Sequence, residues 1–175
     1  MKRHVMICGL LMLLVVPVCY GNDDASPPAA HPGLEKLTKL VGTWVAADKD
    51  NQPTDQVVSV IKLTAGGSAV HETLFPGQPH EMVSIYMVDG DDLVMTHYCM
   101  LGNQPRMKAD PKSPANQIRF VFAGGSNLNP QKDKHMHGAT LTIVDADHIE
   151  IDGEGWENGK PAHEMCGKMK LVRQK

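Results

Sequence analysis

The amino-acid sequence predicts an all-β protein, an antiparallel up-and-down β-barrel of about ten strands preceded by one short helix. After Gly42, runs rich in Val, Ile, Thr and Tyr alternate with turn clusters such as DKDNQP, FPGQP, DGDD and ENGKP. The links have the length of hairpins, which favours pairing of consecutive strands. The sequence also contains no long helical segment that could connect parallel strands.

The composition favours a barrel over two packed sheets. Several predicted strands carry apolar residues on both faces, as in QVVSVIKL and EMVSIYMV. Aromatic residues make up only 5% of the chain, whereas methionine occurs eleven times. Flexible methionine side chains suit an irregular cavity. A two-sheet β-sandwich is the alternative, because periodicity alone does not separate the two architectures.

The first 21 residues predict a secretory signal peptide. A basic pair at positions 2–3 precedes an apolar run over positions 5–18, and Cys19 and Gly21 are small residues two apart. We therefore expect cleavage after Gly21. The apolar run is shorter than the roughly 20 residues of a membrane-spanning helix, which argues against a retained anchor. Val18 before Cys19 argues against a lipoprotein. The expected location is secreted or periplasmic, with no membrane span after cleavage.

The remainder predicts a tether and one domain. Residues 22–32, NDDASPPAAHP, are polar and proline-rich and are expected to form a disordered linker. Residues 33–175 are expected to form the barrel, which is long enough to bury a core. Loss of Lys2 and Arg3 leaves 15 of the 17 basic residues against 20 acidic ones. This negative balance, without a basic stripe, argues against a nucleic-acid partner.

The start of the domain resembles a known superfamily. The segment 33–42, GLEKLTKLVG, has helical spacing and ends at Gly42, and Trp44 follows two residues later. A short helix that leads into Gly-x-Trp resembles the opening of lipocalin-like (calycin) barrels. That resemblance implies structural roles for Gly42 and Trp44, with the tryptophan packed across the closed end.

Two finer resemblances follow. No helical pair separates the first two predicted strands, so the chain is more similar to a ten-stranded nitrobindin-like meander than to fatty-acid-binding barrels. Residues 34–173 also resemble a group of uncharacterised exported bacterial proteins that share GGSAV.ETLFPG.PHEM, THYC..GNQPRM and HMH segments. The nitrobindin likeness implies a haem held by a histidine late in the chain, but no motif here identifies that histidine.

Side-chain alternation predicts which strand faces look inward, because residues two apart share a face. In residues 93–99, LVMTHYC, His97 shares a mainly apolar face with Met95 and Cys99. In residues 135–143, the same rule places His135 and His137 on the face of Ala139, Leu141 and Ile143. Both faces are expected to be interior, with the histidine pair at a rim under the glycine-rich loop 124–134.

The same alternation rule applies to three further side chains, those of Glu72, Cys99 and Cys166. The pattern leaves open whether His71 or Glu72 points inward. Cys166 lies on the lysine-bearing side of the last predicted strand and is expected to face water, whereas Cys99 is expected inside. A disulfide needs Cα atoms within roughly 7 Å and converging side chains, so both thiols are expected to be free.

The histidines support two interpretations. His71, His97, His135 and His137 form a candidate metal site, because imidazole is a ligand for Zn, Cu, Ni and Fe. Only His135-x-His137 has any local ligand spacing, however, and structural zinc prefers four closely spaced N or S ligands. In the alternative, the histidines are hydrogen-bonded polar residues of a cavity or a hairpin end.

The segment THYCMLGNQPRM supplies further candidates. Arg106 with Tyr98 can hold a carboxylate or another anionic group, because the guanidinium fork binds oxyanions in a bidentate manner. In the alternative, GNQP is simply a turn and Arg106 is solvated. Arg119 is expected to face outward, opposite inward Ile118 and Phe120.

The sequence gives no catalytic motif, since neither GGSAV nor GGSNL has the second glycine of a nucleophile elbow. The leading hypothesis is an exported, non-catalytic barrel that binds a small, mainly hydrophobic or amphipathic molecule. The candidate ligand contacts are Met95, His97, Tyr98, Arg106 and His137. The alternative is a metal- or haem-binding protein or enzyme using the histidine cluster, or one in which His97 and Glu72 act as acid and base.

Overall fold

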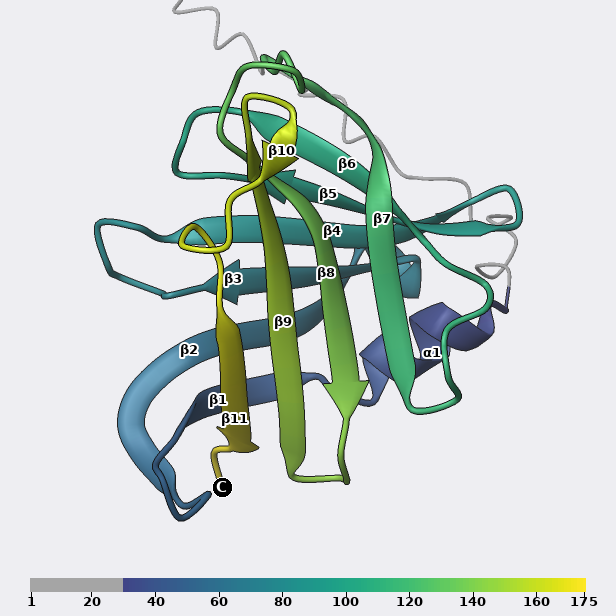
Figure 1. Cartoon of the computed structure of the whole chain (residues 1–175). Helices are drawn as coiled ribbons and strands as arrows, with labels where there is room; N and C mark the ends of the chain where they lie inside the picture. Colours follow the sequence, from purple (N-terminus) through teal and green to yellow (C-terminus); the bar gives the residue numbers. More distant parts are fainter. Residues whose placement is uncertain (1–29) are drawn as a thin grey trace, which may run out of the picture.

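Ten antiparallel strands close into a barrel in the computed structural model, which describes residues 30–175 (Figure 1). The prediction of an all-β barrel with a short helix is confirmed. The ring closes because β8 pairs with β9, β9 with β11 and β11 with β1, which rules out the two-sheet sandwich. The predicted signal peptide, residues 1–21, and residues 22–29 of the predicted linker lie outside the described residues.

The elements within the described part of the chain are α1 (Pro32–Thr38), β1 (Gly42–Ala47), β2 (Pro53–Thr64), a 3-10 turn (Ala65–Gly67), β3 (Ala69–Leu74), β4 (Met82–Asp89), β5 (Asp92–Tyr98), β6 (Gln104–Ala109), β7 (Gln117–Ser126), β8 (His135–Ile143), β9 (His148–Glu157), β10 (Lys160–Pro161) and β11 (Lys168–Arg173). Strands β1 to β9 pair in sequence order, as hairpin-length links predict.

The last predicted strand, AHEMCGKMKLV at residues 162–172, is a strand only in its second half, because β11 begins at Lys168. Lys160 and Pro161, in the predicted turn ENGKP, form the short strand β10, which pairs with the end of β9. Between β10 and β11, residues 162–167 make a turn in which Met165 N–H donates to the Ala162 carbonyl at 3.1 Å. We call residues 162–167 the strap.

The helix α1 covers one end of the barrel. His31 caps it, its Nδ1 accepting the Gly33 N–H at 3.1 Å, and Pro32 occupies the first turn, where a missing N–H has no cost. Leu34 and Leu37 are buried, and Leu37 reaches the interior of the barrel. The helix is therefore held mainly by packing of its apolar face, since seven residues are too few for independent stability.

Trp44 anchors that end. Its side chain is fully buried, and its indole Nε1–H donates to the Leu40 carbonyl at 2.8 Å. The bond satisfies the one polar atom of the ring and fixes the turn between α1 and β1. Gly42 begins β1 with a φ of +143°. A Cβ added at Gly42 would stand 2.8 Å from Nη1 of Arg173. A side chain at Gly42 would therefore strain the backbone and collide with the arginine.

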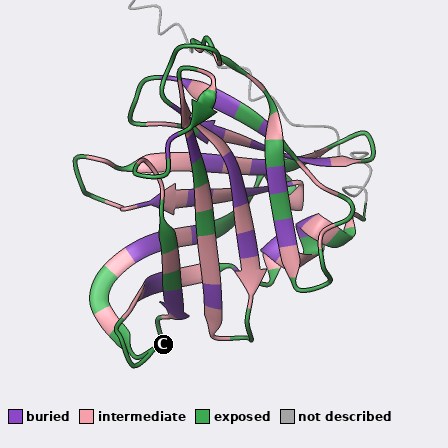
Figure 2. Ribbon diagram, viewed as in Figure 1, coloured by how far each residue is buried: buried purple, intermediate pink, exposed green. Residues whose placement is uncertain are grey.

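The interior of the barrel is a packed core (Figure 2). A cavity of about 40 Å³ remains, lined by Val70, Glu72, Tyr86, Met95 and ten other residues. Such a volume holds a few water molecules at about 10–15 Å³ each. Sites for drug-sized ligands are roughly 300–1,000 Å³. The expectation of a ligand chamber enclosed by the strands is therefore corrected, because methionine, leucine and phenylalanine side chains fill that space.

Candidate functional site

A pocket of about 390 Å³ opens at the end of the barrel away from α1. We call it the vestibule. It lies between the ends of β3, β4 and β5 and the strap, which Figure 1 shows in yellow. Its lining is mostly apolar and includes five methionines, which are Met82, Met100, Met136, Met165 and Met169. Methionine side chains adapt their shape to what they contact, which suits a binding surface.

Two glycines of β9 let the strap lie close to the barrel. A Cβ at Gly155 would stand 2.6 Å from Cβ of Met165, and one at Gly153 would stand 3.0 Å from Cβ of Cys166. Cys166 therefore lines the vestibule. The prediction that it faces water is wrong. The alternation rule fails at this position because the strap is not a strand. Burial raises the pKa of the Cys166 thiol, and the neighbouring Cys99 adds to this rise.

The inner wall beside the vestibule carries Cys99 and Met82. The Cys99 Sγ lies 4.0 Å from the Met82 Sδ. Both cysteines of the described chain, Cys99 and Cys166, are free thiols. Met95 and His97 face inward, as the alternation of residues 93–99 predicts, and the half-buried Cys99 follows the end of β5.

A buried carboxyl group lies deeper. Glu72 is 4% exposed and accepts hydrogen bonds from Ser59 Oγ at 2.6 Å and from Tyr86 OH at 2.5 Å. Desolvation raises the pKa of Glu72, and the two donors only partly oppose the rise. Burial, with the Glu72 charge nearby, also raises the pKa of Tyr86 well above its usual value. Glu72 thus points inward, which settles the open alternative, and His71 points to the other face.

His97 is the second buried polar group of the inner wall. It is 2% exposed, and its Nδ1 shares a 3.0 Å hydrogen bond with Ser84 Oγ. Burial lowers the pKa of His97 to about 4, so the ring is neutral near neutral pH. Ser84 is the cross-strand partner of both His97 and Glu72. Glu72 bonds to Ser59 and Tyr86, however, so serine, histidine and carboxylate do not form the relay of a hydrolytic triad.

The pair His135 and His137 lies in a separate aromatic cluster. His135 is fully buried, and its Nε2 lies 2.9 Å from Nδ1 of His137. The His137 ring stacks on Trp156 at 3.9 Å and on Phe122 at 4.6 Å between ring centroids. Desolvation and the neighbouring His135 lower the pKa of His137. Neither histidine lines the cavity or the vestibule.

A β-bulge explains why the prediction for this strand needs correction. The pairing of β8 with β9 shifts between Met136 and Gly138, so His137 has no partner of its own. Ala139 and Leu141 still face inward, but beyond the bulge it is Met136 that lines the interior. One extra residue reverses the alternation, because the side-chain period of a strand is two.

The other predicted site residues are dispersed. Tyr98 is 48% exposed, and Arg106, also exposed, pairs with Asp89 at 2.6 Å, so neither lines the vestibule. Both have even numbers on strands whose odd positions face inward. Met95 lines the interior cavity, and Arg119 faces outward toward Glu154 at 3.6 Å. Within residues 30–175, no three His, Cys, Asp or Glu side chains are placed to hold one metal ion, so the four predicted histidines do not converge.

The sequence matches no protein-family model and no curated protein. In the part of the chain that the structure describes, no helix combines the length and the apolar character that a bilayer crossing requires.

The residues do not fit the haem that the nitrobindin likeness implies. A porphyrin needs a site of several hundred Å³, far more than the interior cavity of about 40 Å³. The histidines from the later part of the chain, His135, His137, His148 and His163, do not line the vestibule either. We therefore derive no chemistry from a haem.

Sequence reasoning missed the vestibule itself. Its wall is built from the ends of β3, β4 and β5, the start of β8 and the strap, which are far apart in the chain. The glycines at positions 153 and 155 were one available signal, since glycines two apart on one strand face mark a close approach of another segment.

Proposed function

We propose that this protein binds a small, mainly apolar molecule in the vestibule. The observation that carries the proposal is a pocket of about 390 Å³ whose wall is predominantly apolar and holds five methionines. This volume falls within the range of known small-molecule sites, roughly 300–1,000 Å³. Burial of a ligand against such a wall is favourable by about 25 cal/mol per Å² of apolar surface.

Other hollows on the described surface are less suitable. One of about 460 Å³ is bordered by Asn51, Gln52, Glu150 and Lys170, and one of about 540 Å³ by Asp55, Asp147 and Arg173. Their polar and charged walls hold water well and give an apolar molecule little gain. The vestibule is thus the best candidate site for an apolar ligand.

The charges at the rim of the vestibule favour an uncharged ligand. Lys134 and Lys168 border it, but each is already paired, with Glu157 at 3.6 Å and with Glu150 at 2.6 Å. An anionic head group would have to compete with these carboxylates for the ammonium groups. The preferred ligand is therefore neutral.

The vestibule and the interior cavity share three lining residues, Leu74, Met136 and Ile151. Rotation of the unbranched Met136 side chain would join the two spaces. A ligand with a polar group at one end would then reach Ser84 and Glu72, while its apolar part stays among the methionines. This arrangement would give orientation to an otherwise non-directional contact.

A neutral fluorescent probe tests the proposal. N-phenyl-1-naphthylamine should bind the mature protein saturably, with one site and a Kd in the micromolar range. Met100→Lys places a charge in the vestibule at a residue that is 60% exposed, and it should weaken binding at least about tenfold. Met87→Lys is the matched control, because Met87 is 47% exposed on β4 and does not line the vestibule. Equal binding by both variants, or no saturable binding, would contradict the proposal.

We also propose a wider relationship and a location. The closed barrel, the plug formed by α1 and the buried Trp44 support membership of the lipocalin-like superfamily and likeness to the exported bacterial group. The predicted signal peptide supports secretion or export to a periplasm. Expression of the full chain in a bacterium should yield a mature protein whose mass corresponds to a start at Asn22. Retention of residues 1–21 in the isolated protein would contradict export by this route.

A further inference from the structure

Sulfur atoms are concentrated at one end of the barrel. The vestibule contains five of the eight methionines in residues 30–175, together with Cys166, and Cys99 contacts one of those methionines. Apolar binding alone does not require sulfur, because leucine would fill the same space. Thiolate and thioether ligands together select soft metal ions, of which copper(I) is the main biological example.

Met82 on β4 and His97 on β5 line the inner edge of the vestibule, and Cys99 directly follows β5. Ser84 on β4 pairs across the sheet with His97 on β5, and Val83 pairs with Tyr98. Met82 and Cys99 stand one position beyond this last recorded pair, and their sulfur atoms are 4.0 Å apart. Directly opposite residues of an antiparallel pair have Cβ atoms about 4.5–5.5 Å apart, so both side chains can reach one point.

The sulfur–sulfur distance suits a metal ion between the two atoms. Two sulfur ligands at about 2.3 Å from one ion, separated by the 120° of a trigonal site, are about 4 Å apart. The observed 4.0 Å between Cys99 Sγ and Met82 Sδ equals this value. The two sulfur atoms thus have the separation of two ligands of one ion.

His97 supplies a third donor. Its Nδ1 bonds to Ser84 Oγ, whereas its Nε2 has no hydrogen-bond partner among the residues that the structure describes. The side chain is 2% exposed and lines the vestibule beside Met82. A neutral imidazole with one nitrogen oriented by a second-shell hydroxyl is the form in which histidine binds metal ions.

We propose that Cys99, Met82 and His97 bind one soft monovalent metal ion, copper(I) or its analogue silver(I), at the inner edge of the vestibule. The Cys99 thiol releases its proton to solvent when the ion binds, and the resulting thiolate balances the positive charge of the ion in an apolar surrounding. Methionine and histidine contribute neutral donors. The site offers zinc no complete set of four N or S ligands, which favours the soft ion.

Binding can be measured with copper(I) added under anaerobic conditions to reduced, desalted mature protein, in competition with a chromogenic copper(I) chelator. We expect one ion per chain. Cys99→Ser should weaken binding at least about 100-fold, since loss of even a supporting second-shell partner costs about 10–100-fold. Met82→Leu should weaken it by about tenfold at nearly constant volume. Met87→Leu, a change of the same kind on the outer face of β4, should have no effect.

Several results would overturn the proposal. These are the absence of stoichiometric copper(I) binding, equal affinity of the native protein and Cys99→Ser, and loss of binding in Cys166→Ser with retention in Cys99→Ser. Circular dichroism shows whether each variant is folded, so a lost site is distinguished from a lost structure. The neutral-probe experiment is carried out without metal and reports on the apolar wall, to which Met82 and His97 also belong, whereas the Cys99 thiol outside that wall is required for metal binding alone. Failure of one proposal therefore leaves the other standing.

Discussion

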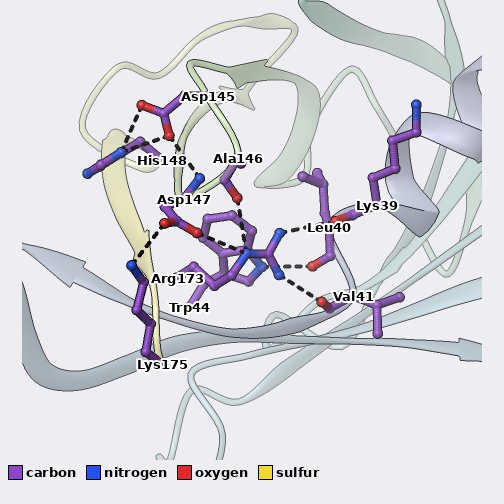
Figure 3. Close-up of polar contacts among 10 residues, drawn as sticks. All are labelled: Lys39, Leu40, Val41, Trp44, Asp145, Ala146, Asp147, His148, Arg173 and Lys175. Atoms are coloured by element: carbon purple, nitrogen blue, oxygen red, sulfur yellow. Dashed lines mark hydrogen bonds and ion pairs between the residues drawn. The ribbon is translucent and has the colours of Figure 1, made fainter.

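The guanidinium of Arg173, on the last strand, lies 4.4 Å from the ring centroid of Trp44, on the first strand, and the two residues are register partners in the sheet. The same guanidinium donates to the carbonyls of Val41 at 2.8 Å, Lys39 at 3.0 Å and Ala146 at 3.1 Å (Figure 3). The contact therefore connects β1, β11, the end of α1 and the turn between β8 and β9. The hydrogen bond to Lys39 also satisfies the carbonyl of the C-cap residue of α1.

These contacts predict that Arg173, although at the surface, contributes strongly to the stability of the protein. Arg173→Ala removes three donors and the cation–π contact, so the free energy of unfolding should fall by about 2–4 kcal/mol. Arg119→Ala is the matched control, because Arg119 has only a surface pair with Glu154 and should cost less than about 1 kcal/mol. Urea unfolding with an unchanged m-value measures both. A loss of similar size in the two variants would show that Arg173 does not act as described.

Glu72 should make stability decrease as the pH rises. Its pKa in the folded protein is raised above the ordinary 4.5, so the folded state keeps a proton that the unfolded chain has lost. The free energy of unfolding therefore falls as the pH rises from about 4.5 through the raised pKa. Glu72→Gln keeps the shape and cannot ionise, so its stability relative to the native protein should increase from about pH 4 to about pH 8. A constant difference over that range would contradict the raised pKa.

His97 should make stability increase as the pH rises, over a lower pH range than for Glu72. Its pKa is about 4 in the folded protein against 6.5 ordinarily, so only the unfolded chain binds the proton between these values. Stability is fully present above about pH 6.5 and is lost as the pH falls toward 4, by roughly 3 kcal/mol in total. In His97→Gln this loss should be absent, so the two unfolding curves converge on acidification. His163→Gln, at an exposed histidine, should follow the native protein.

The strap should detach when a side chain is added beneath it. Gly155→Ala places a Cβ 2.6 Å from Cβ of Met165, so the strap must move away from β9. We expect faster proteolytic cleavage within residues 162–167 and a loss of about 1–3 kcal/mol in the free energy of unfolding. Gly167→Ala is the control in the same segment, because nothing lies within 4 Å of an added Cβ there. Equal cleavage rates for the two variants would show that the strap is not held by this close approach.

Much of the fold was accessible from local patterns. Turn clusters separated the runs of β-forming residues from β1 to β9, and hairpin-length links led to the pairing of these strands in sequence order. Alternation also identified the inward face of β5, because that strand is regular and its odd positions are mainly apolar. These features depend on short stretches of chain, whose preferences the sequence states directly.

The candidate site was much less accessible. The bulge at His137 reverses the face of the start of β8, and the strap removes Cys166 from the predicted last strand. Both departures come from packing between segments far apart in sequence. A bulge adds one residue to a strand, and a glycine allows another segment to approach closely. Neither feature changes the local sequence pattern strongly enough to be predicted.

The sequence by itself thus determined an all-β barrel with a short helix and the inward placement of Met95 and His97, because a strand fixes its own alternation. Only the tertiary structure decided that the interior is filled, that an apolar vestibule lies under the strap, and that Cys99 meets Met82. Those outcomes depend on register, closure and the volume left by neighbouring side chains. These are properties of the whole ring of strands and are not encoded in any one of them.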